Sequence, residues 1–190
     1  MVDEFMNRKG YDAACAAIDR ANADDPSHHE LLYSQRMVAW IHKLAPGASE
    51  ELRLAIRAQH IRRWTLPRSQ YPEGRSGYLH WRETLKHFHA DTLAAIMREA
   101  GYGAAAVAKA TAILIRKNLA NDAEGQTLED AACLVFLQFE FDDFARKTPH
   151  DKMIGILRKT WGKMSPVARK HAGNLQHSEE ARTLLQRALA

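Results

Sequence analysis

The chain has little cysteine and no long apolar run. Cys15 and Cys133 are its only cysteines in 190 residues, too few for the disulfide framework of a small secreted protein. No stretch approaches the roughly 18 apolar residues that a transmembrane helix needs. No basic segment followed by an apolar one opens the chain, as a signal peptide would. We therefore expect a cytoplasmic protein that does not associate with membranes.

Signals for β-structure are also nearly absent. No run rich in valine, isoleucine, threonine and tyrosine alternates with polar residues, and neither Asn-Gly nor Asp-Gly marks a hairpin turn. The charge is only mildly unbalanced, with 27 basic and 23 acidic residues and a formal net charge of +4, which does not by itself indicate nucleic-acid binding. With 46% hydrophobic residues, the chain can bury one core.

Helix-start signals recur along the chain instead. They predict an all-α fold, with a single globular domain over residues 1–190 and eight or nine helices. The expected starts follow capping and first-turn proline rules; they are Ser27 with capping-box spacing to Glu30, Ser49, Ser76, Thr127, Thr148–Pro149, Ser165–Pro166 and Ser178. The helix opened by Ser76 is expected to end before Gly101, a favourable residue after a helix. Another helix is expected over residues 104–118.

One segment, residues 64–75, cannot form a continuous helix because it contains two prolines and a glycine. It also carries Trp64 and Tyr71, whose rings prefer packed surroundings, and this argues against disorder. A loop of this length in a compact domain is usually functional. We therefore predict an ordered loop that lies over a functional site and connects the helix of His60 to the helix of His89.

Three polar residues, His60, His89 and Asp130, stand where the helical pattern calls for apolar ones, each on the stripe of a different predicted helix. A buried polar group costs about 1–3 kcal/mol unless it finds a partner, so three of them predict a shared site. We predict that they are catalytic and bind a divalent metal (Mn, Fe, Ni or Zn), which suits imidazole and carboxylate ligands and could activate a water. The alternative is a buried hydrogen-bonded network, with Asp130 serving its own helix N-terminus.

Cations concentrate between residues 57 and 89. The predicted substrate-binding residues are Arg62, Arg63, Arg68, Tyr71, Arg75 and Lys86. The planar guanidinium of arginine matches the geometry of phosphate or carboxylate. The expected ligand is a phosphorylated small molecule or a nucleotide, and an RNA backbone would also suit such a loop. The alternative is a set of surface groups paired with carboxylates such as Glu73 and Glu83.

Short stretches spread over most of the chain resemble a known family. They are Glu30-Leu31-Leu32-Tyr33, Arg36-Met37, Gln59-His60-Ile61-Arg62-Arg63-Trp64, Pro67-Arg68-Ser69, Tyr71-Pro72, Gly77-Tyr78, Lys86-His87-Phe88-His89, Gln126-Thr127-Leu128-Glu129-Asp130, Leu157-Arg158-Lys159-Thr160-Trp161 and Lys163-Met164-Ser165-Pro166. On these stretches the chain resembles the domain-of-unknown-function family 4202. That resemblance implies no activity.

The chain is also similar, at the level of fold, to HD-domain phosphohydrolases, which are helical proteins with a His…His-Asp…Asp metal site. The stretch 54–60 resembles their helix that ends in His-Asp, and the stretch 127–134 resembles the helix that carries the last Asp, here Asp130. The resemblance implies an HD-like helical core and a metal-dependent phosphohydrolase. The chain departs from the pattern at Ile61, which replaces the Asp of the His-Asp pair, at Ser34, which aligns with the first His, and at Asn118, near an auxiliary His.

Three functions remain open from the sequence. The leading hypothesis is an HD-like hydrolase acting on a phosphorylated small molecule or nucleotide, in which His60, His89 and Asp130 hold a metal or orient a water. A competing hypothesis is a non-catalytic module on a degenerate HD-like core that binds an anion, a nucleotide or an RNA, and the loss of the His-Asp pair at Ile61 favours it. A third is an interaction protein whose basic face meets an acidic partner.

Overall fold

The computed structural model describes residues 2–116 and 122–190, with side chains from residue 9 onward, and every regular element in these ranges is a helix. The elements in chain order are α1 (Val2–Ala23), α2 (His29–Leu44), α3 (Glu50–Arg57), the 3₁₀ turns η1 (Arg63–Thr65) and η2 (Arg68–Gln70), α4 (Gly74–Glu99), α5 (Ala104–Ile115), α6 (Ala123–Val135), the π-helix η4 (Phe136–Glu140), α7 (Phe141–Arg146), α8 (His150–Lys163), α9 (Pro166–Ala172) and α10 (Glu179–Leu189). The predicted all-α fold is confirmed. The predicted starts correspond to eight of these helices, and α1 and α7 are additional.

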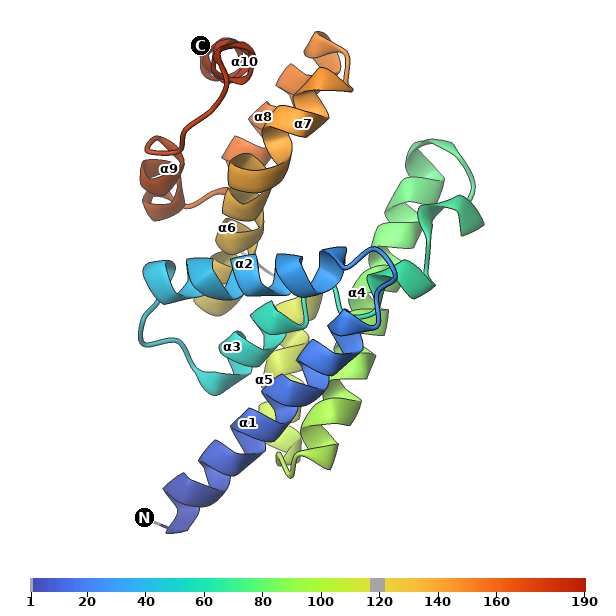
Figure 1. The fold of residues 1–190 in the computed structure, drawn as a ribbon, viewed down its shortest axis with the longest axis vertical. Helices are drawn as coiled ribbons and strands as arrows, with labels where there is room; N and C mark the ends of the chain where they lie inside the picture. The colour runs from blue at the N-terminus through green and yellow to red at the C-terminus, as the bar shows by residue number, and fades with distance from the viewer. Residues whose placement is uncertain (1, 117–121) are drawn as a thin grey trace.

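Helix α2 crosses the middle of the molecule (Figure 1). In that view α3 and α5 lie below it, and α7 to α10 lie above it toward the C-terminus. The tightest packing joins α4 to α5, α2 to α6, α3 to α5 and α8 to α10. The core includes Leu54 of α3, Leu93 of α4, and Leu128 and Leu134 of α6, none of which has exposed surface. No helix in the described ranges is long and apolar enough to cross a membrane.

Three of the predicted serine caps are confirmed. The hydroxyls of Ser49, Ser165 and Ser178 accept hydrogen bonds from backbone N–H groups three residues later, at 3.2, 3.2 and 3.3 Å. Each bond satisfies a donor that has no partner within its own helix. The predicted end of the long helix before Gly101 is confirmed as well, because Gly101 has a φ of 89° directly after the last turn of α4.

Four predicted starts are wrong. At α8 the N-cap is Pro149, not Thr148, and no side chain caps the helix. At the other three, the cap or the first residue lies outside the recognised motif. The carboxylate of Asp25, not Ser27, accepts from the N–H groups of His29 and Glu30, at 2.9 and 3.1 Å. Helix α6 begins four residues before Thr127, where Asp122 accepts from the N–H of Gly125 at 2.8 Å. Helix α4 begins at Gly74, two residues before Ser76. Because Asp25 caps α2, the side chain of Glu30 is free to point elsewhere.

The segment of residues 64–75 packs against the start of α4. Arg68 holds it in shape by donating to the carbonyls of Tyr71 and Pro72, at 2.8 and 2.7 Å. The indole of Trp81 in α4 donates to the carbonyl of Leu66 at 2.9 Å. The segment also lies close to Gly77, where a side chain would collide with a backbone carbonyl. These contacts fix the path of the chain between the histidine at residue 60 and α4.

The helix that runs from α6 into α7 is interrupted by the π-helix η4. This segment faces α2. The indole of Trp40 donates to the side-chain oxygen of Gln138 at 3.0 Å, and the guanidinium of Arg36 lies 4.1 Å from the centre of the Phe139 ring. π-Helical turns are rare and are often found near functional sites. Here the turn places Glu140 within electrostatic reach of Tyr33 in α2.

Candidate functional site

The structure brings His60 and His89 together, with their ring centres 6.2 Å apart. His89 lies on α4, as predicted, whereas His60 lies in turns three residues after the end of α3. The His60 ring stacks on Tyr33 of α2, with ring centres 3.9 Å apart and an angle of 8° between the planes. Three segments far apart in the chain therefore meet at these rings.

The tautomer of His89 follows from its surroundings. Its Nδ1 lies 2.9 Å from the carbonyl oxygen of Ile61. A carbonyl oxygen only accepts hydrogen bonds, so Nδ1 carries the hydrogen and Nε2 carries a lone pair. The residue is 4% exposed, and no hydrogen-bond donor reaches Nε2 from the described part of the chain. His89 thus presents a buried basic nitrogen whose orientation is fixed by the backbone.

Both histidines are held in the neutral form. Burial, followed by the neighbouring His60, lowers the pKa of His89 to about 3. Burial also places the pKa of His60 well below its ordinary value, with further lowering by Arg63, His29, Arg82 and Arg116. Both rings are therefore neutral near pH 7.

A buried carboxylic acid lies beside this pair. The side chain of Glu30, in the first turn of α2, is 8% exposed, and its Oε2 lies 3.2 Å from His60 Nδ1. The two groups are poorly aligned, so neither atom has a hydrogen-bond partner. Burial raises the pKa of Glu30, and the charges of His29 and Arg63 offset part of the rise. This carboxyl can hold a proton at a higher pH than an exposed glutamate can.

Asp130 is buried as predicted, but the structure places its carboxylate on other partners. Oδ1 accepts from the Ser165 N–H at 2.8 Å and from the side-chain amide of Gln126 at 2.9 Å, and Oδ2 accepts from the Ser165 hydroxyl at 2.5 Å. Both oxygens are thus engaged at the start of α9. The set His60, His89 and Asp130 does not fit one metal ion in this arrangement. No group of three histidine, cysteine or carboxylate side chains in the described ranges is placed to share one.

A cluster of cations lies next to the histidines and centres on a buried arginine. The Arg116 side chain, directly after α5, is 7% exposed, and its Nη1 lies 3.0 Å from Glu129 Oε2. Lys163, at the end of α8, donates to the other oxygen of Glu129 at 2.9 Å. Burial alone would raise the pKa of Glu129, but the charges of Arg116 and Lys163 hold it below its ordinary value. One carboxylate therefore serves two cations.

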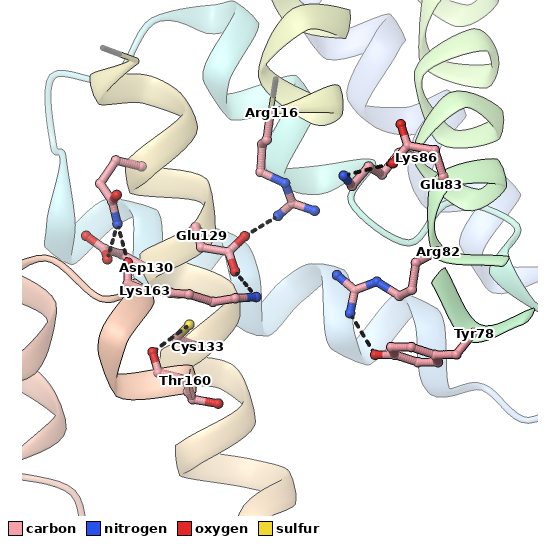
Figure 2. A network of polar contacts seen from close by, with 11 residues as sticks. Tyr78, Arg82, Glu83, Lys86, Arg116, Glu129, Asp130, Cys133, Thr160 and Lys163 are labelled. Carbon is pink, nitrogen blue, oxygen red and sulfur yellow. Dashed lines mark hydrogen bonds and ion pairs between the residues drawn. The ribbon is translucent and has the colours of Figure 1, made fainter. Parts of the chain in front are cut away.

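Two more arginines join this cluster without a carboxylate partner. Figure 2 shows Arg82 of α4 pointing toward Arg116, with its guanidinium bonded to the Tyr78 hydroxyl at 3.2 Å. Arg63 of η1 lies with its guanidinium 4.7 Å from the centre of the Trp81 ring. In the described part of the chain, neither arginine forms an ion pair with a carboxylate. We call Arg63, Arg82 and Arg116 the arginine cluster, and positive charge exceeds negative charge there.

The arginine cluster and the histidine pair form one site. All three arginines lower the pKa of His60, and Arg63 also lowers that of His89, so their charges lie within electrostatic reach of the rings. Burial lowers the pKa of Arg63 and that of Arg116, which shows that these cations are partly removed from water. The site therefore combines desolvated positive charge with neutral, hydrogen-bonding rings.

The predicted substrate-binding residues divide between this site and other places. Arg63 lies in the cluster, and Lys86 points toward it in Figure 2 while bonded to Glu83 at 3.1 Å. Arg62 and Arg75 are exposed. Tyr71 packs against His80 with ring centres 5.6 Å apart. Arg68 donates its hydrogen bonds to backbone carbonyls of its own loop and to that of Gly74, so its role is to hold the shape of the loop.

Sequence reasoning missed several members of the site. Arg82 could have been found, because residues 82, 86 and 89 are spaced to share one face of a helix. Glu30 was assigned to a capping box, which Asp25 replaces. Arg116 and Lys163 have no local signal, because they reach the site only through the ends of α5 and α8. Asn118, near an auxiliary histidine position of the HD pattern, lies outside the described residues.

Comparisons with known proteins place the chain in a family without naming an activity. No curated protein and no solved structure matches it. The likeness to HD-domain proteins therefore stays a prediction. The family model described as "Domain of unknown function (DUF4202)" matches residues 12–185, so the chain belongs to that family.

Proposed function

We propose that this protein binds a phosphorylated small molecule or a nucleotide through the arginine cluster. The observation that carries the proposal is the unbalanced, partly buried charge of the cluster. Arg116 is almost fully buried and shares its carboxylate with Lys163. Arg63 and Arg82 add two cations that form no ion pair among the described residues, and Glu30 lies within electrostatic reach of Arg63. Buried charges require counter-charges. Guanidinium groups converging from different elements suit the oxygens of a phosphate.

The burial of the cluster favours a small anion over an RNA backbone. An extended polyanion is bound by exposed cations along a face. The exposed arginines Arg62, just before the predicted loop, and Arg75, at its end, are not part of the cluster, and Arg116 lies inside the fold. A compact phosphate group can enter such a place more readily than a polymer can. The following test therefore distinguishes binding of RNA from binding of a small phosphorylated ligand.

The test is a calorimetric titration of the full chain with inorganic phosphate, pyrophosphate and a set of 5′-nucleotides. We expect Arg82→Gln to weaken binding at least about tenfold, because loss of a charge-assisted contact costs roughly 1.5–3 kcal/mol. Arg75→Gln, an exposed arginine on the same helix, is the matched control and should bind like the wild type. Equal affinity of the Arg82→Gln and wild-type proteins, or binding of RNA alone with a steep salt dependence, would refute the proposal.

A phosphohydrolase is a second candidate, and the contact between Glu30 and His60 is what favours it. A carboxyl group whose pKa is raised lies 3.2 Å from a neutral imidazole, so this pair can hold or pass a proton beside a bound phosphate. No step is assigned to a metal, because the predicted ligand set does not fit one. The assay is release of phosphate from nucleotides and p-nitrophenyl phosphate, with and without Mn, Fe, Ni or Zn. Turnover by a His60→Ala variant at the wild-type rate would remove this candidate.

A further inference from the structure

The site contains three buried polar atoms that no partner satisfies among the described residues. They are His89 Nε2, Glu30 Oε2 and His60 Nδ1. Buried polar groups in folded proteins nearly always have a hydrogen-bond partner, so each exception calls for an explanation. These three belong to neighbouring side chains, as the contact between Glu30 and His60 and the approach of the two rings show. A single bound group could supply the missing partner.

The chemistry of His89 specifies a hydrogen-bond donor as its partner. His89 Nε2 can only accept, because its Nδ1 holds the hydrogen against the Ile61 carbonyl. An ionised Glu30 also only accepts. The oxygens of a phosphate dianion accept as well, so a phosphate placed here would leave His89 unsatisfied and would meet the negative charge of Glu30. The phosphate is therefore expected at the arginines, and a hydroxyl is expected at the histidines.

The geometry of α4 relates the expected phosphate position at the arginines to the expected hydroxyl position at the histidines. Arg82, Lys86 and His89 are spaced by four and three residues, which places them on one face of the helix. The Cα atoms of Arg82 and His89 are about 10 Å apart along the axis, from a rise of about 1.5 Å per residue. The long side chain of Arg82 and the imidazole take up part of this distance. The remainder suits a ligand in which a hydroxyl group lies a few bonds from the phosphorus.

We propose that the ligand is a phosphate monoester with hydroxyl groups a few bonds from its phosphorus, and that His89 Nε2 accepts a hydrogen bond from one of them. Pentose phosphates and 5′-nucleotides share this chemistry. An ionised Glu30 can accept from a neighbouring hydroxyl group of the same ligand. This inference rests on the proposed function, because the arginine cluster must hold the phosphate.

The experiment compares the affinities of ribose 5-phosphate and methyl phosphate for the full chain. We expect ribose 5-phosphate to bind at least tenfold more tightly. The variant His89→Phe, which keeps an aromatic ring and removes the acceptor, should bind the two compounds alike and should leave the affinity for methyl phosphate within about twofold. His87→Phe, an exposed residue on the same helix, is the matched control and should behave like the wild type.

The outcomes separate the two proposals. Equal affinities of the wild type for the two compounds would overturn the hydroxyl site and leave phosphate binding intact. Failure of both compounds and of the nucleotides to bind would overturn the proposed function itself. If His89→Phe does not fold, the test is the ¹⁵N chemical shift of His89 Nε2 in the wild-type protein. This shift should change when ribose 5-phosphate binds and should not change when methyl phosphate binds. An equal change with both compounds would refute the inference. The affinity for adenosine 5′-monophosphate then identifies the class of ligand. A higher affinity than for ribose 5-phosphate would indicate a nucleotide, and an equal affinity would indicate a sugar phosphate.

Discussion

Lowering the pH from 7 to 5 is expected to reduce the free energy of unfolding, and His89 alone should account for about 2 kcal/mol of the loss. An unfolded histidine takes up a proton near pH 6.5, whereas burial lowers the pKa of folded His89 to about 3. The stabilisation is therefore complete above about pH 6.5 and is lost progressively as the pH falls toward 3. Each pH unit in that window costs about 1.4 kcal/mol. His60 acts in the same direction, while the raised pKa of Glu30 acts in the opposite one.

The measurement is urea denaturation followed by circular dichroism at both pH values. The variant His89→Asn keeps an amide N–H for the Ile61 carbonyl and has no group that titrates. The difference in stability between pH 7 and pH 5 should be about 2 kcal/mol smaller in this variant than in the wild type. His87→Asn, at an exposed histidine of α4 that pairs with Glu83, is the control and should change the difference by far less than His89→Asn does. A wild-type pH dependence in His89→Asn would show that the buried neutral ring does not control it.

Asp130→Ala is expected to lower the free energy of unfolding by about 3 kcal/mol and to leave phosphate affinity unchanged. The substitution removes the acceptor of three hydrogen bonds, from the N–H and hydroxyl of Ser165 and from the amide of Gln126. The two Ser165 donors join α6 to the start of α9 and would be left without their buried partner. Chemical denaturation gives the stability, and calorimetry at a temperature where the variant is folded gives the affinity.

Two further variants make this result specific. Asp130→Asn keeps one acceptor at similar volume and should recover about half of the lost stability. Asp143→Ala removes an exposed carboxylate that pairs with Arg146, and should change stability by less than about 0.5 kcal/mol. Loss of phosphate binding in a folded Asp130→Ala protein would instead return Asp130 to the site predicted from the sequence.

The helical fold could be predicted because its signals are local. The serines at residues 49, 165 and 178 cap helices a few positions away, and a local motif contains all the information that such a contact needs. The prediction was wrong where two local caps compete. Asp25 and Ser27 both precede α2, and only the path of the folded backbone decides that Asp25 receives the N–H groups.

The site could be predicted only in part. A polar residue on the apolar stripe of a helix indicates that its side chain is buried, but it does not indicate which residue the side chain binds. This reasoning found His89 and Asp130, which are 4% and 5% exposed. The partner of Asp130 lies 35 residues away, and the carboxylate near His60 comes from α2. Arg116 reaches the site because α5 ends where it does. Such partners depend on how the helices pack, which a periodic pattern does not specify.

The π-helix between α6 and α7 sets which side of α7 faces the core. A π turn has the backbone of an α-helix with one residue inserted. It therefore changes the angular position of every later residue of that helix, up to Arg146, by about 100°, the angle of one residue in a helix of 3.6 residues per turn. A single deletion within residues 136–140 could restore an unbroken α-helix without losing a turn of hydrogen bonds. It would nevertheless rotate the buried residues Phe141 and Ala145 away from the core that now contains them. The register of α7 relative to α6 is thus encoded in one extra residue, which makes this segment far less tolerant of length changes than of substitutions.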